Sequence, residues 1–118
     1  MEMSLHHVQL SGPAGCEEAM RAFWVGAIGL TEVVKPERLR ARGGAWFRGG
    51  RLEVHVGIED DFAPARKAHP GIAVGDVEAL SASVASSGAP VTWDDNIPGV
   101  RRFHTTDPVG NRVEFQQA

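Results

Sequence analysis

The sequence predicts an α+β fold made of two tandem modules, each with the order strand, helix, strand, strand, strand. The segments "RLEV" at 51–54 and "RVEF" at 112–115 share one pattern, in which a glutamate stands between two apolar residues. His7 precedes Glu53 by 46 residues and His69 precedes Glu114 by 45, which gives a repeat of about 61 residues. The order of strand-like and helix-like patterns is also the same in the two halves.

The first module is expected to span about 5–58. Its opening segment alternates polar and apolar residues, and "SGPAG" then breaks the strand. Met20, Phe23, Trp24 and Ala27 follow at helical spacing, and Gly29 is a plausible end for that helix. In chain order, the expected elements are a strand over 5–11, a helix over 16–28, a strand over 30–35, a loop over 36–44 and a hairpin of strands over 45–49 and 51–58.

The second module is expected to span about 69–117, after a charged linker over 59–68. Asp76 is suited to cap a helix that Gly88 ends. We interpret the two modules together as one domain covering 1–118. The expected elements are a strand over 69–75, a helix over 77–87, and strands over 90–95, 101–107 and 112–116.

Alternation along the strands gathers polar side chains on one face of each sheet. Val113 and Phe115 point away from Glu114, and Leu52 and Val54 point away from Glu53. If the two sheets curve around a common cavity, the imidazoles and carboxylates converge into a ligand set for a divalent ion. The alternative is that each glutamate pairs with a neighbouring arginine on a solvated face. The polar set is His7, Gln9, Glu53, His55, His69, Glu114 and Gln116.

Composition narrows the class of protein. The 118-residue chain has a formal net charge of −3 and a pI of about 5.9, so it offers no basic face for nucleic acid. It shows no apolar run of membrane-spanning length and no signal peptide, and we expect a cytoplasmic protein. Cys16 is the only cysteine, which excludes an internal disulfide. A thiol enzyme using Cys16 would lack a base partner, so a small packing residue is the simpler interpretation.

Four segments resemble the vicinal oxygen chelate superfamily. They are "HHVQL" near the start, "FWVGAIGL" at 23–30, "HPGIAV" at 69–74 and "DPVGNRVEF" at 107–115, and the resemblance covers roughly 5–117. The superfamily includes glyoxalase I, fosfomycin-resistance thiol transferases, extradiol dioxygenases, methylmalonyl-CoA epimerase and bleomycin-resistance proteins. The resemblance implies the glyoxalase/bleomycin-resistance fold, in which paired βαβββ modules form a U-shaped mixed sheet around a divalent metal.

The resemblance also implies a ligand set. Carried over residue by residue, the metal ligands are His7, Glu53, His69 and Glu114. His55 lies two residues beyond Glu53 on the same face, so it is an alternative ligand or a substrate contact. The repeat aligns Glu53 with Glu114 and therefore favours Glu53. The metal is expected to be Zn, Ni, Mn or Fe.

Other residues are candidates for substrate contact. His104 stands where many members carry an aromatic residue; it either adds an imidazole near the pocket or lies on the opposite face. Trp46 either walls the cavity or packs in the core. Arg101 and Arg102 are candidates for a bidentate contact with an anionic group of the substrate; because they are adjacent, we expect one of them to reach solvent instead. Gln9 is on the polar face of the first strand.

The function that the resemblance implies is that of a glyoxalase-like metal-dependent enzyme, an isomerase, lyase or thiol transferase. A small substrate would chelate the ion through its oxygens, and Glu53 or Glu114 would shuttle a proton. One alternative is a metal-free protein that sequesters an antibiotic, although such a binder needs none of the four ligand positions. A second alternative is a dioxygenase, against which the short chain argues. Members of the superfamily are commonly homodimers, and we expect one here.

Overall fold

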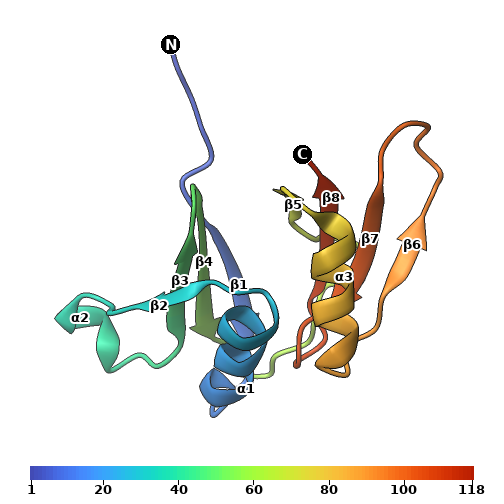
Figure 1. Ribbon diagram of the computed structural model, residues 1–118. Coiled ribbons are helices and arrows are strands. Elements are labelled where there is room, and N and C mark those ends of the chain that lie inside the picture. The colour runs from blue at the N-terminus through green and yellow to red at the C-terminus, as the bar shows by residue number, and fades with distance from the viewer. The chain divides into compact units, whose positions relative to one another are not determined.

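The computed structural model describes residues 1–118 and divides the chain into two units, Met1–Ala63 and Pro64–Ala118. Each unit contains one four-stranded sheet with a helix beside it (Figure 1). None of the helices has the length and apolar character that crossing a bilayer requires.

The first unit has the predicted βαβββ order with a short additional helix. Its sheet order is β1-β4-β3-β2, in which β1 runs parallel to β4 and the other neighbours are antiparallel. The elements are β1 (Val8–Gly12), α1 (Glu17–Arg21), the π-helix η1 (Ala22–Ala27), β2 (Thr31–Val33), α2 (Glu37–Arg40), β3 (Ala45–Gly49) and β4 (Leu52–Ile58).

The second unit repeats this architecture. Its sheet order is β5-β8-β7-β6, with β5 parallel to β8, so the prediction of two βαβββ modules is confirmed. Figure 1 shows α3 lying beside this sheet. The elements are β5 (Gly71–Val74), α3 (Val77–Ser86), β6 (Thr92–Asp94), β7 (Arg102–Thr106) and β8 (Arg112–Gln117).

Three predictions about local structure were wrong in detail. The segment expected as a loop over 36–44 contains α2, which begins directly after Pro36. The first helix does not stay α-helical, because Ile28 donates to the Phe23 carbonyl over five residues at 2.9 Å. The opening strands are shorter than expected, so His7 and His69 both lie before the first residue of β1 or β5.

Each unit has its own apolar core on one side of its sheet. Phe47, Val54 and Val56 of the first sheet are buried with Met20, Phe23 and Trp24 of its helix. Phe103, Val113 and Phe115 of the second sheet are buried with Val77 and Val84 of α3. Because strand residues alternate, the residues between these apolar positions are left for the other face of each sheet. The core therefore decides where the polar side chains gather.

Candidate functional site

The polar face of the second sheet carries a cluster centred on Glu114. Glu114 of β8 is paired across the sheet with His104 of β7 and, on its other side, with Gly71 of β5. Phe103 and Phe115, the next residues along β7 and β8, point into the core, so His104 and Glu114 must share the opposite face.

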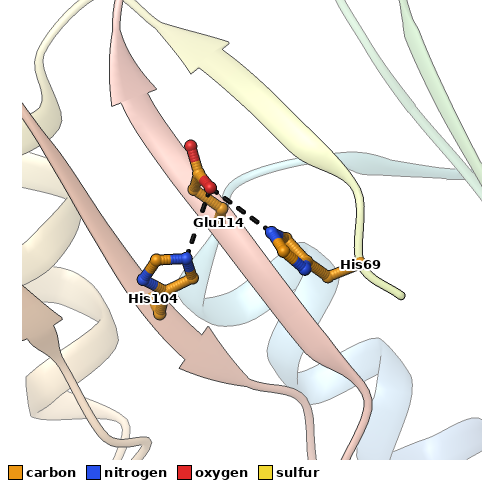
Figure 2. A group of neighbouring side chains, drawn as sticks. All are labelled: His69, His104 and Glu114. Atoms are coloured by element: carbon orange, nitrogen blue, oxygen red, sulfur yellow. Dashed lines mark hydrogen bonds and ion pairs between the residues drawn. The ribbon is translucent and has the colours of Figure 1, made fainter. Parts of the chain in front are cut away.

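Two imidazoles meet one carboxylate oxygen at the centre of this cluster. Nε2 of His69 and Nε2 of His104 each lie 3.3 Å from Oε1 of Glu114. Figure 2 shows both rings directed at that carboxylate. The Glu114 side chain is only 10% exposed, so these contacts are shielded from most of the solvent.

The orientation of His69 is set by the segment that precedes β5. Its Nδ1 lies 2.7 Å from the carbonyl oxygen of Lys67, which can only accept, so Nδ1 carries the ring hydrogen. Arg112 of β8 donates to the carbonyls of Arg66 and Lys67 at 3.1 and 3.5 Å and so holds this segment. In the neutral ring, Nε2 of His69 is then an acceptor that faces a carboxylate oxygen.

That arrangement fits a cation. An acceptor nitrogen and a carboxylate oxygen 3.3 Å apart need a proton or a metal ion between them. The donor atoms of His69, His104 and Glu114 all lie within 4.8 Å of one another. Ligand atoms on a tetrahedral zinc ion stand about 3.3 Å apart when the metal–ligand bonds are about 2.0–2.1 Å. Two imidazoles and one carboxylate also form a donor set that suits zinc and non-haem iron.

Arg102 and Asp94 extend the cluster along the sheet. Nη1 of Arg102 lies 3.1 Å from Oε1 of Glu114, and its Nη2 lies 3.1 Å from Oδ2 of Asp94. Nδ1 of His104 is 3.9 Å from the same Asp94 oxygen. The backbone N–H of Asn96 donates to Asp94 and, with Arg102, holds the pKa of that carboxyl below its ordinary value.

The polar face of the first sheet carries a second group of predicted site residues. The His55 ring is stacked between His7, at 4.2 Å between centroids, and Trp46, at 3.9 Å. Nε2 of His55 lies 3.1 Å from Oε1 of Glu53, and Arg48 lies 3.4 Å from Oε2. The hydrogen bond from His55 lowers the pKa of Glu53, and the charge of Arg48 adds to the effect.

The structure thus distributes the predicted site residues over the two units. His69, His104, Arg102 and Glu114 lie together in the second unit. In the first unit His7, Trp46 and Glu53 each contact His55, and Gln9 is paired with His55 across β1 and β4. The four-ligand set of His7, Glu53, His69 and Glu114 stays a prediction from the resemblance.

Sequence reasoning missed Asp94 and Arg112, and it left the face of His104 open. A signal existed for each. Trp93 and Phe103 are apolar strand residues, so Asp94 and His104, the residues that follow them, belong on the polar face. Arg112 shares the face of Glu114 two residues away, but its bond to the carbonyls before β5 depends on the sheet pairing.

Comparison with known proteins places this fold. A glyoxalase family protein from Bacillus anthracis is 42% identical, with a TM-score of 0.94, and the match covers 99% of this chain and 96% of that one. A lactoylglutathione lyase from Agrobacterium tumefaciens is 20% identical, with a TM-score of 0.75, and the match covers 99% of this chain and 95% of that one.

An antibiotic binding protein from a Streptomyces species is 23% identical, with a TM-score of 0.69 and 98% of both chains covered. At these lower identities, the second and third similarities bear on the fold alone. No family model and no curated protein matches the chain. All three similarities confirm the predicted fold class. The glyoxalase family protein, at 42% identity, confirms the resemblance to the vicinal oxygen chelate superfamily.

Proposed function

The chain belongs to the glyoxalase family, and on that premise we propose that it is a metal-dependent enzyme acting on a small substrate whose oxygen atoms chelate a divalent ion. The reaction class we favour is an isomerisation or lyase reaction, as the name of the similar lactoylglutathione lyase indicates for that protein, and the alternative class is thiol transfer.

One observation carries the proposal. The Lys67 carbonyl fixes the ring hydrogen of His69 on Nδ1, and this leaves Nε2 as an acceptor 3.3 Å from a carboxylate oxygen. His104 presents its Nε2 to the same oxygen at 3.3 Å. An acceptor nitrogen beside a carboxylate oxygen needs a proton or a cation between them, and a divalent ion fits that place.

His69, His104 and Glu114 are the residues of the second unit that would hold the ion. When bound, a divalent cation supplies a Lewis acid that stabilises negative charge on substrate oxygens. The Lys67 carbonyl keeps the His69 ring in one tautomer, and Arg112 keeps that carbonyl in place. The sheet pairing of His104 with Glu114 orients the other two side chains.

Glu114 is also the group of this cluster best placed to move a proton. Its Oε1 is occupied by the histidines and Arg102, whereas Oε2 faces Gly71, where an added Cβ would lie 3.9 Å away. Gly71 therefore puts no side chain over this oxygen. We propose that Oε2 accepts a proton from the substrate and returns it at a neighbouring atom.

The first test of this proposal is metal content. Protein purified without an affinity tag or chelator is expected to contain close to one divalent ion per chain by elemental analysis. Glu114→Gln and His69→Ala should lose the ion. Glu78→Gln removes a charge from an exposed glutamate of the same unit and should keep it. If no variant and no wild-type protein takes up Ni²⁺, Zn²⁺, Mn²⁺ or Fe²⁺, the proposed enzyme function is wrong.

The second test is activity. The metal-loaded protein is assayed for formation of lactoylglutathione and for thiol transfer, with Glu114→Gln as the inactive control and Glu78→Gln as the active one. Activity in the Glu114→Gln protein that equals wild-type activity would remove Glu114 from the mechanism.

A second candidate function is supported by Arg102. Its Nη1 lies 3.1 Å from Oε1 of Glu114, so the guanidinium is an internal counter-ion for this carboxylate when no metal is bound. This favours the metal-free sequestering protein, of which the similar antibiotic binding protein is an example. Equilibrium dialysis of metal-free protein against flat aromatic antibiotics tests it. Binding that survives in His69→Ala, together with absent metal in the wild type, would favour this candidate.

A further inference from the structure

Arg102 occupies a position at Glu114 that a divalent cation would compete for. The guanidinium Nη1 approaches the same oxygen, Oε1, that both histidine Nε2 atoms face, at 3.1 Å against 3.3 Å for each imidazole. One carboxylate oxygen thus has three neighbours, of which one carries a permanent positive charge.

The guanidinium is also confined. Its side chain is only 15% exposed, and Nη2 is bound to Oδ2 of Asp94 at 3.1 Å. Its Nε is buried without a hydrogen-bond partner, so the two carboxylates are what hold it in place. Asp94 is itself anchored by the backbone N–H of Asn96 at 2.8 Å. Arg102 therefore cannot simply turn to solvent when a second cation arrives.

We propose that Arg102 is a built-in competitor for the metal, and that it weakens divalent-cation binding at His69, His104 and Glu114 in the wild-type protein. The inference rests on the proposed metal site. A divalent ion held at Oε1 of Glu114 would repel a guanidinium that shares this oxygen, and the repulsion is large in a partly buried site. Arg102 is a positioning residue in this account, because it acts on the metal through Glu114.

The chain provides a matched control in the neighbouring arginine. Arg101 carries the same charge but points elsewhere: its Nε lies 2.7 Å from Glu78, its guanidinium stacks over Trp93 at 3.5 Å, and its side chain is 52% exposed. Replacing Arg101 changes the net charge by the same amount as replacing Arg102. Any difference between the two variants therefore reports the local contacts of Arg102 with Glu114 and Asp94, and not the net charge.

The experiment titrates metal-free protein with Co²⁺ and with Zn²⁺ alone, following the Co²⁺ d–d absorption and the heat of binding. Arg102→Gln is expected to lower Kd at least tenfold. Arg101→Gln is expected to leave Kd within about twofold of wild type. Arg102→Lys keeps the positive charge and should stay close to the wild-type Kd.

Asp94 needs its own control, because its carboxylate loses a partner in Arg102→Gln and could attract the ion itself. The double variant Asp94→Asn, Arg102→Gln is therefore compared with the single variant Asp94→Asn. The double variant is expected to bind the ion more tightly than the single variant. Metal-free Arg102→Gln should also have a lower Tm than metal-free wild type. Adding Co²⁺ should raise the Tm of this variant by more than it raises the Tm of wild type. A purely structural role would lower stability without tightening Kd.

The outcomes separate this inference from the proposed function. Equal Kd values for wild type and Arg102→Gln, or an equal gain in Arg101→Gln, overturn the inference and leave the metal site intact. Absence of binding in both wild type and Arg102→Gln overturns the inference and the proposed metal site together. Binding by Arg102→Gln with none by wild type supports the inference and assigns the wild-type protein to the metal-free candidate function.

Discussion

The His55 imidazole is the most enclosed histidine of the first unit. Its ring lies between those of His7 and Trp46, and its side chain is 6% exposed. Nε2 is 3.1 Å from Oε1 of Glu53. The His55 ring is covered on both faces, so its Nε2 can hold the Glu53 carboxylate in one orientation. Carboxylates that bind metal ions are commonly held by hydrogen bonds of this kind. Of the two candidate ligands that the resemblance implies, we therefore propose Glu53 and not His55.

This choice gives a prediction about metal content. The ligand set that the resemblance implies predicts that Glu53→Gln lowers the bound metal per chain well below that of His55→Gln, because the first change removes a predicted ligand and the second removes only its support. Elemental analysis of both proteins, with Glu78→Gln as a neutralised glutamate outside the polar faces, measures it. Full loss of metal in His55→Gln with retention in Glu53→Gln would make His55 the ligand.

Asp107 organises the turn that precedes β8. Its carboxylate accepts from the backbone N–H groups of Val109 and Asn111, at 3.1 and 2.8 Å, and from the Asn111 side chain at 2.8 Å. Asp107→Ala would leave these donors without their acceptor in a buried turn. We expect a loss of about 2–3 kcal/mol in the free energy of unfolding, measured in urea. Asp95→Ala, at an exposed position, should change it little, and a comparable loss there would contradict the assignment.

Asp107 also gives a pH dependence with a definite sign. Burial raises the pKa of Asp107 above the ordinary value of 3.8, against the hydrogen bonds from Asn111, which lower it. The folded protein thus holds this proton more tightly than the unfolded chain, so the stability contributed by Asp107 falls as pH rises from 3.8 through the raised pKa. The free energy of unfolding of wild type minus that of Asp107→Asn is expected to decrease over this range. An increase would mean that the carboxylate hydrogen bonds outweigh burial.

At the scale of single elements, patterns within the sequence predicted most of the molecule. The helix over 77–87 was readable because Asp76, Gly88 and an apolar stripe all indicate it, and α3 is observed over Val77–Ser86. The sequence does not predict the π-helical turn of η1, because the apolar spacing there suits an α-helix equally well. The contact of Arg112 with the Lys67 carbonyl was also inaccessible, since it joins residues that only the pairing of β5 and β8 brings together.

The N-terminus of α3 provides a prediction at this scale. Oδ1 of Asp76 accepts from the backbone N–H of Ala79 at 3.0 Å, and the side chain of Gln117 accepts from Val77 at 3.0 Å. Asp76→Ala is expected to lower the free energy of unfolding by about 1 kcal/mol, whereas Asp76→Asn keeps an acceptor and should lower it by less than half of that. Equal losses in the two variants would show that charge, and not the cap bond, is what stabilises the helix.

At the scale of the whole molecule, the resemblance predicts a homodimer. Light scattering after size exclusion is expected to give twice the chain mass of 12.7 kDa at micromolar concentration. A mass of one chain at every concentration would contradict this prediction. It would not contradict the metal site proposed within the second unit.

Metal binding should also be visible in the stability of the whole chain. A ligand that binds only the folded protein adds about 2.7 kcal/mol when its free concentration is 100 times Kd, which corresponds to a rise in Tm of roughly 10 °C for a domain of this size. We expect Zn²⁺ to produce this rise in wild type and in Glu78→Gln, and a chelator to reverse it. Glu114→Gln should show no rise, because it lacks the oxygen at which His69 and His104 converge. A rise in Tm that persists in Glu114→Gln would mean that the ion binds elsewhere. Comparing the two proteins therefore tests where the ion binds as well as whether it binds.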